Sequence, residues 1–485
     1  MRRLALAAVS VAVLCSVACG RPRTSILLIS VDSLRADEVG AVVDGKPVAP
    51  RMAEFAREAV SFDGAVAAAS WTTPSMMSVM TGLPARAHGV EEHDRALAPQ
   101  VETLAERLQR SGYKTAAFVP AVTLRPEYGF GRGFGLYDFE DFGHHRTSSP
   151  ALTGKVLNQL EQWKAEPFFI WVHLWDPHYN YLPPPPWDSS FRGGTRPARE
   201  DLQCLKWVEN AVTPMEAEYL RGQFRGEIAY TDRHVGEILD QLNKLGLSSS
   251  TIVVVLGDHG EAFNEHGWLT HTMRVDQEMV RVPLMFRWPA KLVPRHMVQP
   301  VSLASVARTV LRLALDQRDF GSTIALDMQA EAPTAAAPVL TETVRMGCFT
   351  ALVDASFKYV LDHRSCRETL FDLSADPGER DDLSANRPDV LLRYRAELQR
   401  QLAGIKALHT PHAALPPETV NEAEAALRSI GYVAGGGKPS GSEIVCAMLP
   451  DPRTIRHDAF GDALVYEACP SEGPERCFAT SQPGR

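Results

Sequence analysis

Thr251-Ile-Val-Val-Val-Leu256, followed by Gly257-Asp258-His259-Gly260-Glu261, is the stretch of sequence that most directly indicates the fold. The run is apolar and β-branched, as is typical of a strand in a parallel sheet covered on both faces. A second run, Ser25-Ile-Leu-Leu-Ile-Ser-Val31, has the same character and leads into Asp32. Because ligands of open α/β sheets bind beyond the carboxyl ends of the strands, we expect the polar residues after both runs to lie together.

A hydroxyl side chain precedes a predicted helix in the segment Thr72-Thr73-Pro74-Ser75. Pro74 suits the first helical turn, and Thr73 suits the N-cap. The backbone N–H groups at such a helix start, with the helix dipole behind them, favour a tetrahedral oxyanion beside the Thr72 side chain. The predicted ligands of one divalent cation are Asp32, Thr72, Asp258 and His259.

A series of further motifs has a fixed order along the chain. They are Ile29-Ser-Val-Asp-Ser-Leu-Arg-Ala-Asp37, Trp71-Thr-Thr-Pro-Ser75, Thr81-Gly82, His88-Gly89, Asp176-Pro-His178, Asp258-His-Gly-Glu261, Glu265-His-Gly267, Arg281-Val-Pro-Leu284, Phe371-Asp-Leu-Ser-Ala-Asp-Pro-Gly-Glu379 and Ile430-Gly-Tyr-Val433. In this order they resemble the sulfatase and alkaline phosphatase superfamily, over residues 24 to 433. The resemblance implies an α/β fold with a mostly parallel central sheet, helices on both faces and a small C-terminal α+β subdomain.

Position 72 departs from the typical sulfatase pattern, which has Cys or Ser there and Arg where this chain has Met76. That Cys or Ser is oxidised to formylglycine, and threonine cannot yield the aldehyde. Thr72 therefore resembles the nucleophile of the superfamily's phosphodiesterases and phosphoglycol transferases. We predict a hydrolase that cleaves phosphate or phosphonate esters through a covalent Thr72 intermediate.

The residues beside the predicted ligands bear on the choice of metal. Calcium arylsulfatases usually carry paired Asp residues at the first motif and Asn after the later Asp, whereas here Val31 precedes Asp32 and His259 follows Asp258. The set is therefore more similar to the manganese or zinc members than to the calcium members, since imidazole shifts preference away from hard metals. A second ion is an open alternative through Asp232-Arg-His234, although the bimetal spacing of the superfamily is not reproduced.

Two further histidines are predicted to act in catalysis. His178 follows the apolar run Phe168 to Leu174 and resembles the histidine that binds the substrate anion. His271 lies twelve positions after His259, where the phosphonate monoester hydrolase branch has Lys. It is predicted to donate to a non-bridging oxygen or to the leaving group. The alternative for both is a loop histidine that is satisfied by water.

Other polar residues near these motifs have supporting roles in the prediction. His173 lies inside the strand run and is expected to be a core residue with one hydrogen-bond partner. Glu261 and His266 are expected to support the site from a second layer.

The first residues have the pattern of an export signal. Arg2-Arg3 precede the apolar stretch Leu4 to Val17, and Ser16-Val-Ala18 is a small-residue cleavage site. Cys19-Gly20 resembles a bacterial lipobox, which predicts a lipoprotein anchored through Cys19 and facing the periplasm or cell surface. The alternative is a secreted soluble protein. The apolar stretch is too short to span a membrane, so no transmembrane helix is predicted in the mature form.

Composition and length agree with a large globular enzyme. The chain has 485 residues, 45% of them hydrophobic, and a formal net charge of −9. This charge argues against nucleic acid as a partner, and the predicted partner is a small-molecule, glycan-linked or lipid-linked sulfate or phosphate ester. The predicted domains are a signal peptide (1–18), a catalytic α/β domain (19–330), a C-terminal α+β subdomain (331–433) and a polar tail (434–485) whose composition is compatible with disorder.

Cysteines outside the signal region permit disulfides in an exported protein. Cys348 and Cys366 are candidates for a bridge between neighbouring strands, although connectivity cannot be read from spacing alone.

Three other functions remain open from the sequence. They are a sulfuric ester hydrolase similar to arylsulfatases, a transferase of the phosphoethanolamine or phosphoglycol type that uses the same Thr72 intermediate, and a non-catalytic binding lipoprotein on the same scaffold.

Overall fold

The computed structural model describes residues 24–142, 146–197, 209–321, 326, 337–343, 347–408, 412–429 and 477–478. The predicted signal peptide, the predicted lipidation site Cys19 and most of the polar tail lie outside the described residues. None of the described helices combines the length and the apolar content needed to cross a membrane.

Eight strands of the described chain form the central sheet. They are β1 (Ser25–Val31), β4 (Val60–Phe62), β7 (Lys114–Val119), β8 (Leu136–Phe139), β9 (Phe168–Leu174), β10 (Thr251–Gly257), β13 (Leu284–Arg287) and β14 (Arg295–Met297). Their spatial order is β14, β4, β13, β10, β1, β9, β7 and β8. The two pairs that involve β13 are antiparallel and the others are parallel. The predicted mostly parallel sheet is therefore confirmed.

Alternation along β1 explains why helices cover both faces of the sheet. Leu27, Ile29 and Val31 pack into one hydrophobic cluster, whereas Ile26 and Leu28 pack into another. Successive side chains of a strand point to opposite faces, so a strand that is apolar at every position needs a layer on each side.

The helices divide between these two layers. The first layer contains α2 (Pro50–Arg57), α6 (Ser149–Trp163) and α8 (Pro214–Lys244). The second contains α3 (Thr72–Thr81), α5 (Leu104–Arg110), α10 (Ser305–Leu315) and α12 (Pro417–Ser429). Capping boxes at Thr103 and Thr213 satisfy backbone N–H groups at the starts of α5 and α8.

Shorter elements connect these layers. They are α1 (Ala36–Val39), β2 (Val42–Val43), β3 (Lys46–Pro47), β5 (Ala65–Val66), α4 (Ala85–His88), β6 (Arg95–Ala96), η1 (Val122–Leu124), η2 (Pro126–Tyr128), η3 (Trp187–Ser189), β11 (Ala262–Phe263), β12 (Leu269–Thr270), α9 (Gln277–Val280), β15 (Val301–Ser302) and β20 (Ala413–Ala414).

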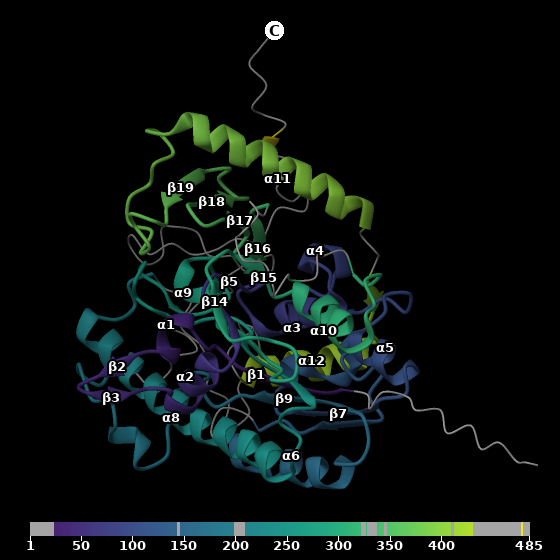
Figure 1. Cartoon of the computed structure of the whole chain (residues 1–485). Helices are drawn as coiled ribbons and strands as arrows, with labels where there is room; N and C mark the ends of the chain where they lie inside the picture. The colour runs from purple at the N-terminus through teal and green to yellow at the C-terminus, as the bar shows by residue number, and fades with distance from the viewer. Residues whose placement is uncertain are drawn as a thin grey trace, which may run out of the picture.

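A second, antiparallel sheet forms the core of the C-terminal part. Its strands, in both chain and spatial order, are β16 (Val339–Thr343), β17 (Phe349–Val353), β18 (Phe357–Asp362) and β19 (Glu368–Asp372). The helix α11 (Pro388–Leu408) lies across this sheet (Figure 1). After α11 the chain returns to the part that contains the central sheet. There β20 pairs with β6, and Ala423 of α12 packs into the second helical layer.

The disulfide in this part differs from the expected one. Cys366 is bonded to Cys477, which lies 111 residues later in the sequence. The predicted bridge between Cys348 and Cys366 is therefore wrong. A disulfide between cysteines so far apart in the sequence leaves no local sequence signal, whereas two cysteines on neighbouring strands do suggest a pair.

Candidate active site

Three adjacent parallel strands bring polar side chains to one edge of the central sheet. Val31 of β1 is in register with Gly257 of β10, and Ser30 is in register with His173 of β9. The residues that follow β1 and β10 therefore emerge side by side. The buried side chains gathered at this edge are Asp32, Thr72, His173, Asp258 and His259.

The Thr72 hydroxyl lies within this cluster at the first residue of α3. Its Oγ1 lies 3.2 Å from Oδ2 of Asp32 and 3.2 Å from Nε2 of His259. Nδ1 of His259 lies 2.9 Å from the carbonyl oxygen of Gly260. Because that oxygen can only accept, Nδ1 carries a proton and Nε2 is the ring atom that faces Thr72.

The start of α3 differs from the prediction in its cap. Trp71 occupies the N-cap position, and no side chain of the described residues caps the helix. Thr73 does not cap, because its hydroxyl donates instead to the carbonyl oxygen of Thr123 at 2.6 Å. Ser75 Oγ donates to the carbonyl oxygen of Asp258 at 2.6 Å, which ties the helix start to the end of β10.

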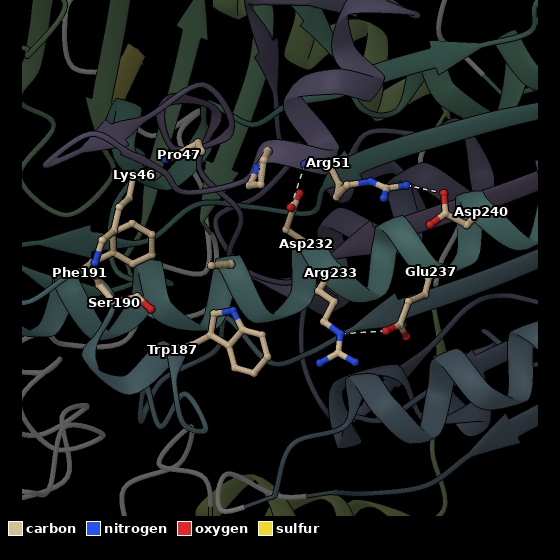
Figure 2. A pocket seen from close by; sticks show the side chains of 12 residues that line it. Lys46, Pro47, Arg51, Trp187, Ser190, Phe191, Asp232, Arg233, Glu237 and Asp240 are labelled. Atoms are coloured by element: carbon tan, nitrogen blue, oxygen red, sulfur yellow. Dashed lines mark hydrogen bonds and ion pairs between the residues drawn. The ribbon is translucent and has the colours of Figure 1, made fainter.

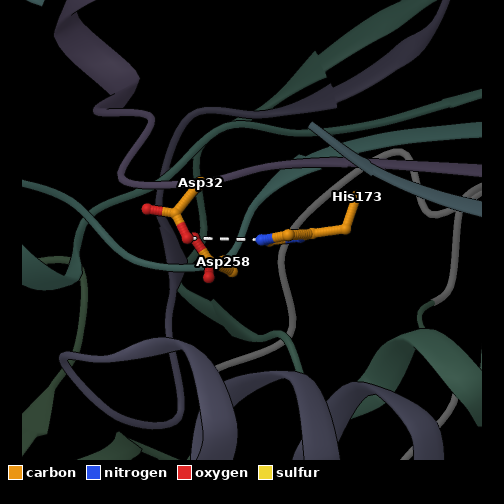
Figure 3. Close-up of side chains that lie close together, drawn as sticks. All are labelled: Asp32, His173 and Asp258. Carbon is orange, nitrogen blue, oxygen red and sulfur yellow. Dashed lines mark hydrogen bonds and ion pairs between the residues drawn. The ribbon is translucent and has the colours of Figure 1, made fainter. Parts of the chain in front are cut away.

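His173 is part of the polar cluster. The expectation that it is a core residue with one hydrogen-bond partner is therefore corrected. Its Nε2 lies 3.2 Å from Oδ2 of Asp32 and its Nδ1 lies 2.8 Å from Oγ of Ser30. One ligand atom each from Asp32, His173 and Asp258 lie within 4.8 Å of one another (Figure 3). His173, near the end of β9, thus contacts the carboxylate that follows the adjacent strand β1 and lies near the carboxylate that follows β10, the next strand along the sheet.

The electrostatics of the two carboxylates fit a bound cation. Burial acts to raise the pKa of Asp32, but His178, His173 and His259 outweigh it and hold that pKa well below its ordinary value. Burial, with a contribution from the charge of Asp32, raises the pKa of Asp258 to about 6 despite the opposing effect of His259.

Neither carboxylate is paired with Lys or Arg among the described residues, and Oδ2 of Asp258 is buried there without a hydrogen-bond partner. Carboxylate oxygens, imidazole nitrogens and a hydroxyl are a donor set suited to a divalent cation.

The two predicted catalytic histidines lie beside this cluster. His178 stacks on Trp175 with ring centroids 3.9 Å apart, and its Nδ1 lies 2.8 Å from the carbonyl oxygen of Tyr179. The ring of His271 lies 4.4 Å from that of His259 and 5.2 Å from that of His178. The structure thus brings together all six predicted site residues and adds His173.

Asp232 and His234 do not join this cluster. Both carboxylate oxygens of Asp232 accept backbone N–H groups, from Arg51 and Met52 at the start of α2. Nδ1 of His234 contacts Glu237. Asp232 lines a surface pocket of about 430 Å³ beside α8 that none of the predicted site residues lines (Figure 2). The Asp232-Arg-His234 segment is therefore the wrong place for a second ion.

Glu261 and His266, the two residues predicted to support the site, lie in different parts of the structure. Glu261 contacts Nδ1 of His271 at 3.0 Å. His266 instead contacts Glu278 at 2.7 Å and the carbonyl oxygen of Gly378 at 3.0 Å, where the loop meets the C-terminal part. His266, Asp276 and Glu278 form a second group with ligand-like spacing. Arg274 already pairs with Asp276, so we assign this group to ion pairing.

Comparison with known proteins places these observations in a family. The Sulfatase family profile matches residues 24–316. Choline-sulfatase of Rhizobium meliloti is 26% identical over 446 residues, which cover 76% of this chain and 83% of that protein. N-acetylglucosamine-6-O-sulfatase of Bacteroides thetaiotaomicron is 24% identical over 327 residues, covering 50% of this chain and 58% of that protein.

Among solved structures, the phosphonate monoester hydrolase of Agrobacterium radiobacter has a similar fold, with a TM-score of 0.65 and 19% identity. The similarity covers 81% of this chain and all of that chain (100%). This chain spans 56% to 60% of the length of three sulfatases that it matches. The family profile nevertheless matches more than half of the chain, and the resemblance read from the motifs is confirmed: the chain belongs to the Sulfatase family.

Proposed function

We propose that this protein is a divalent-metal-dependent hydrolase that cleaves phosphate or phosphonate esters through a covalent intermediate on Thr72. The observation that carries the proposal is the position of the Thr72 hydroxyl, buried at a helix start and 3.2 Å from both Asp32 and His259. A threonine ester of phosphoric or phosphonic acid can be hydrolysed by water, whereas formylglycine chemistry needs Cys or Ser at this position.

The proposed ligands are the four predicted from the sequence, with His173 as an additional candidate. They are Asp32, Thr72, Asp258, His259 and His173. A bound divalent cation would favour ionisation of the Thr72 hydroxyl and offset negative charge on the ester oxygens. Manganese and zinc remain favoured over calcium because the set contains imidazole nitrogens.

In the proposed reaction, Oγ1 of Thr72 forms a bond to phosphorus as the bond from phosphorus to the leaving oxygen breaks. Oδ2 of Asp32 accepts the hydrogen bond of that hydroxyl at 3.2 Å and orients it, and the hydroxyl proton passes to solvent. His178 binds a non-bridging oxygen, and His271 donates a proton to the leaving oxygen. Water then attacks phosphorus, the bond to Oγ1 breaks, and Thr72 regains its proton.

The test is an activity screen of the protein reconstituted with Mn²⁺, Zn²⁺ or Ca²⁺ after chelation. Aryl sulfate, phosphate monoester, phosphate diester and phosphonate ester are compared for wild type, Thr72→Ala and Thr72→Ser. We expect phosphorus-ester turnover that Thr72→Ala lowers by more than about 1,000-fold and Thr72→Ser partly retains. Thr73→Ala is the matched control, because the Thr73 hydroxyl contacts Thr123 instead. Full activity of Thr72→Ala would refute the mechanism.

Sulfate ester hydrolysis is the second candidate, because the named relatives include a choline-sulfatase and an N-acetylglucosamine-6-O-sulfatase. The same screen separates the two, since turnover of aryl sulfate alone would favour this candidate. An intact-mass measurement of the peptide that contains Thr72 would show whether the threonine is unmodified. Transfer to an added alcohol would favour a transferase, and failure to retain any divalent metal would favour a binding role.

Export and membrane anchoring through Cys19 form a separate proposal that rests on the leader sequence. Palmitate labelling of the expressed protein tests it, with Cys19→Ala as the comparison. Labelling that persists in Cys19→Ala would place the lipid on another residue and refute the role of Cys19, and labelling that is missing in the wild type would favour a secreted soluble protein.

A further inference from the structure

A short hairpin brings Glu261 and His271 together. Ala262 of β11 is in register with Thr270 of β12, so the residues just outside this pair face each other at the base of the hairpin. Nδ1 of His271 lies 3.0 Å from Oε2 and 3.3 Å from Oε1 of Glu261. Both side chains are fully buried. The contact is therefore shielded from solvent, where a charged hydrogen bond is strong.

The backbone around His271 is held in an unfavourable conformation. Thr270 and Thr272 have φ values of 62° and 89°, in a region that β-branched residues rarely adopt. The N–H of Thr272 donates to the carbonyl oxygen of Ser70 at 2.9 Å, and Thr343 Oγ1 donates to the carbonyl oxygen of Thr272 at 2.5 Å. Such strain persists only when surrounding contacts impose it, and it is concentrated at functional sites.

Glu261 is itself anchored through its backbone. Its carbonyl oxygen accepts a hydrogen bond from Arg35 at 2.8 Å, and its N–H donates to the carbonyl oxygen of Glu278 at 2.8 Å. These two backbone contacts, with the side-chain contact to His271, give the carboxylate a defined position from which it can orient the imidazole.

We propose that Glu261 is a positioning residue that acts through His271. Its carboxylate accepts a hydrogen bond from Nδ1–H, which fixes the orientation of the ring so that Nε2 faces the leaving oxygen. The ring donates a proton from Nε2 when both nitrogens are protonated, and it keeps the Nδ1 proton afterwards. The inference rests on the proposed function, because it assigns the orientation of the group that protonates the leaving oxygen. Glu261 does not itself touch the reacting atoms.

A double-mutant cycle tests whether Glu261 acts through His271. Wild type, Glu261→Gln, His271→Ala and the double variant are compared on 4-nitrophenyl and phenyl esters of whichever acid the enzyme cleaves. Phenol is the poorer leaving group and depends more on a proton donor. We expect Glu261→Gln to lower kcat on the phenyl ester by about 10- to 100-fold and on the 4-nitrophenyl ester by less than about 3-fold.

In the His271→Ala background, adding Glu261→Gln should have no further effect on the ratio of the two rates. Independent, multiplicative effects of the two substitutions would overturn the inference. The matched control is Glu278→Gln, which breaks a similar contact to His266 at 2.7 Å outside the cluster. This control should leave the ratio of the two rates unchanged.

A spectroscopic measurement tests the same contact without turnover. In ¹⁵N-histidine-labelled protein, with His271→Ala used for assignment, Nδ1 of His271 should carry a proton and Glu261→Gln should shift its resonance. An unprotonated Nδ1 in the wild type would overturn the inference even if phosphorus esters are the substrates. Loss of Thr72 dependence, by contrast, would refute the proposed function and leave this contact to be judged by the spectrum.

Discussion

Oγ1 of Thr72 lies 3.2 Å from Nε2 of His259, although 187 residues separate them in the sequence. The contact joins the first residue of α3 to the end of β10, so any change that moves either element alters the environment of the hydroxyl. The proposed chemistry depends on this meeting of a helix start with a strand end. Substitutions around this meeting point can separate residues that serve the chemistry from residues that serve the fold.

Asp32→Asn should lower the affinity for divalent metal by more than about 100-fold, because it removes a buried negative charge at the centre of the proposed ligand set. The comparison is Ser33→Ala, since Ser33 Oγ only donates to Oδ1 of Asp32 at 2.8 Å. The affinity of Ser33→Ala for divalent metal should fall by about 10-fold. Metal content after dialysis against a range of free metal concentrations measures both. Equal metal retention by Asp32→Asn and wild type would exclude Asp32 as a ligand.

Trp175→Ala should raise KM for the ester by about 10-fold with a smaller change in kcat, because the stack that holds His178 is lost. Trp175→Phe keeps an aromatic face and should stay within about 3-fold of wild type. Steady-state kinetics on the ester identified by the screen provide the measurement. Unchanged KM in Trp175→Ala would show that the stack does not position His178.

Asp176→Ala should destabilise the fold by about 1 to 2 kcal/mol while metal content stays unchanged. Although Asp176 lies in a motif shared with the superfamily, its carboxylate accepts the N–H groups of Ser148 at 2.6 Å and Ser149 at 2.9 Å, at the start of α6. Urea denaturation and metal analysis on the same preparation separate the two effects. Loss of metal without loss of stability would contradict the capping role.

Stability should fall as the pH rises from about 6.5 to 9 because of His266. Burial acts to lower the pKa of His266, but the hydrogen bond to Glu278 and the charges of Asp276, Glu278 and Glu379 outweigh it and raise the pKa to about 9. A raised pKa in the folded state contributes stability that is complete below the unfolded pKa of about 6.5 and is lost as the pH rises through the folded value. After allowance for solvent screening, we expect about 1 to 2 kcal/mol.

Urea denaturation at pH 6.5 and pH 9.5 measures this change, with His266→Gln as the comparison. The variant should lose most of the difference between the two pH values. The same pH dependence in wild type and His266→Gln would place its origin in another group.

Lys358→Met should destabilise the protein by about 3 to 5 kcal/mol, because it leaves Glu379 buried without its cation. Nζ of Lys358 lies 2.6 Å from Oε1 of Glu379, and both side chains are buried. The double variant with Glu379→Leu should recover most of the loss, since no unpaired charge remains. Thermal and urea denaturation of the three variants test this, and a double variant less stable than Lys358→Met would contradict it.

Local sequence was enough to predict the central sheet and the polar residues that follow its two most apolar strands. Continuous β-branched runs have few alternatives to buried parallel strands, and the carboxyl ends of such strands share one edge. Asp32, Asp258 and His259 were therefore predictable as neighbours. The hydroxyl of Thr72 was predictable as a candidate because a helix start has its own local signal.

The contacts of the other side chains depend on how distant segments of the chain pack together. His173 lies inside an apolar run, and its contact with Asp32 follows from the register of β9 with β1 rather than from local pattern. Glu261 meets His271 because of a hairpin register, and Cys366 meets Cys477 across 111 residues. Local sequence specifies propensity and periodicity, whereas pairings between distant segments depend on the whole set of packing contacts, which no short stretch contains.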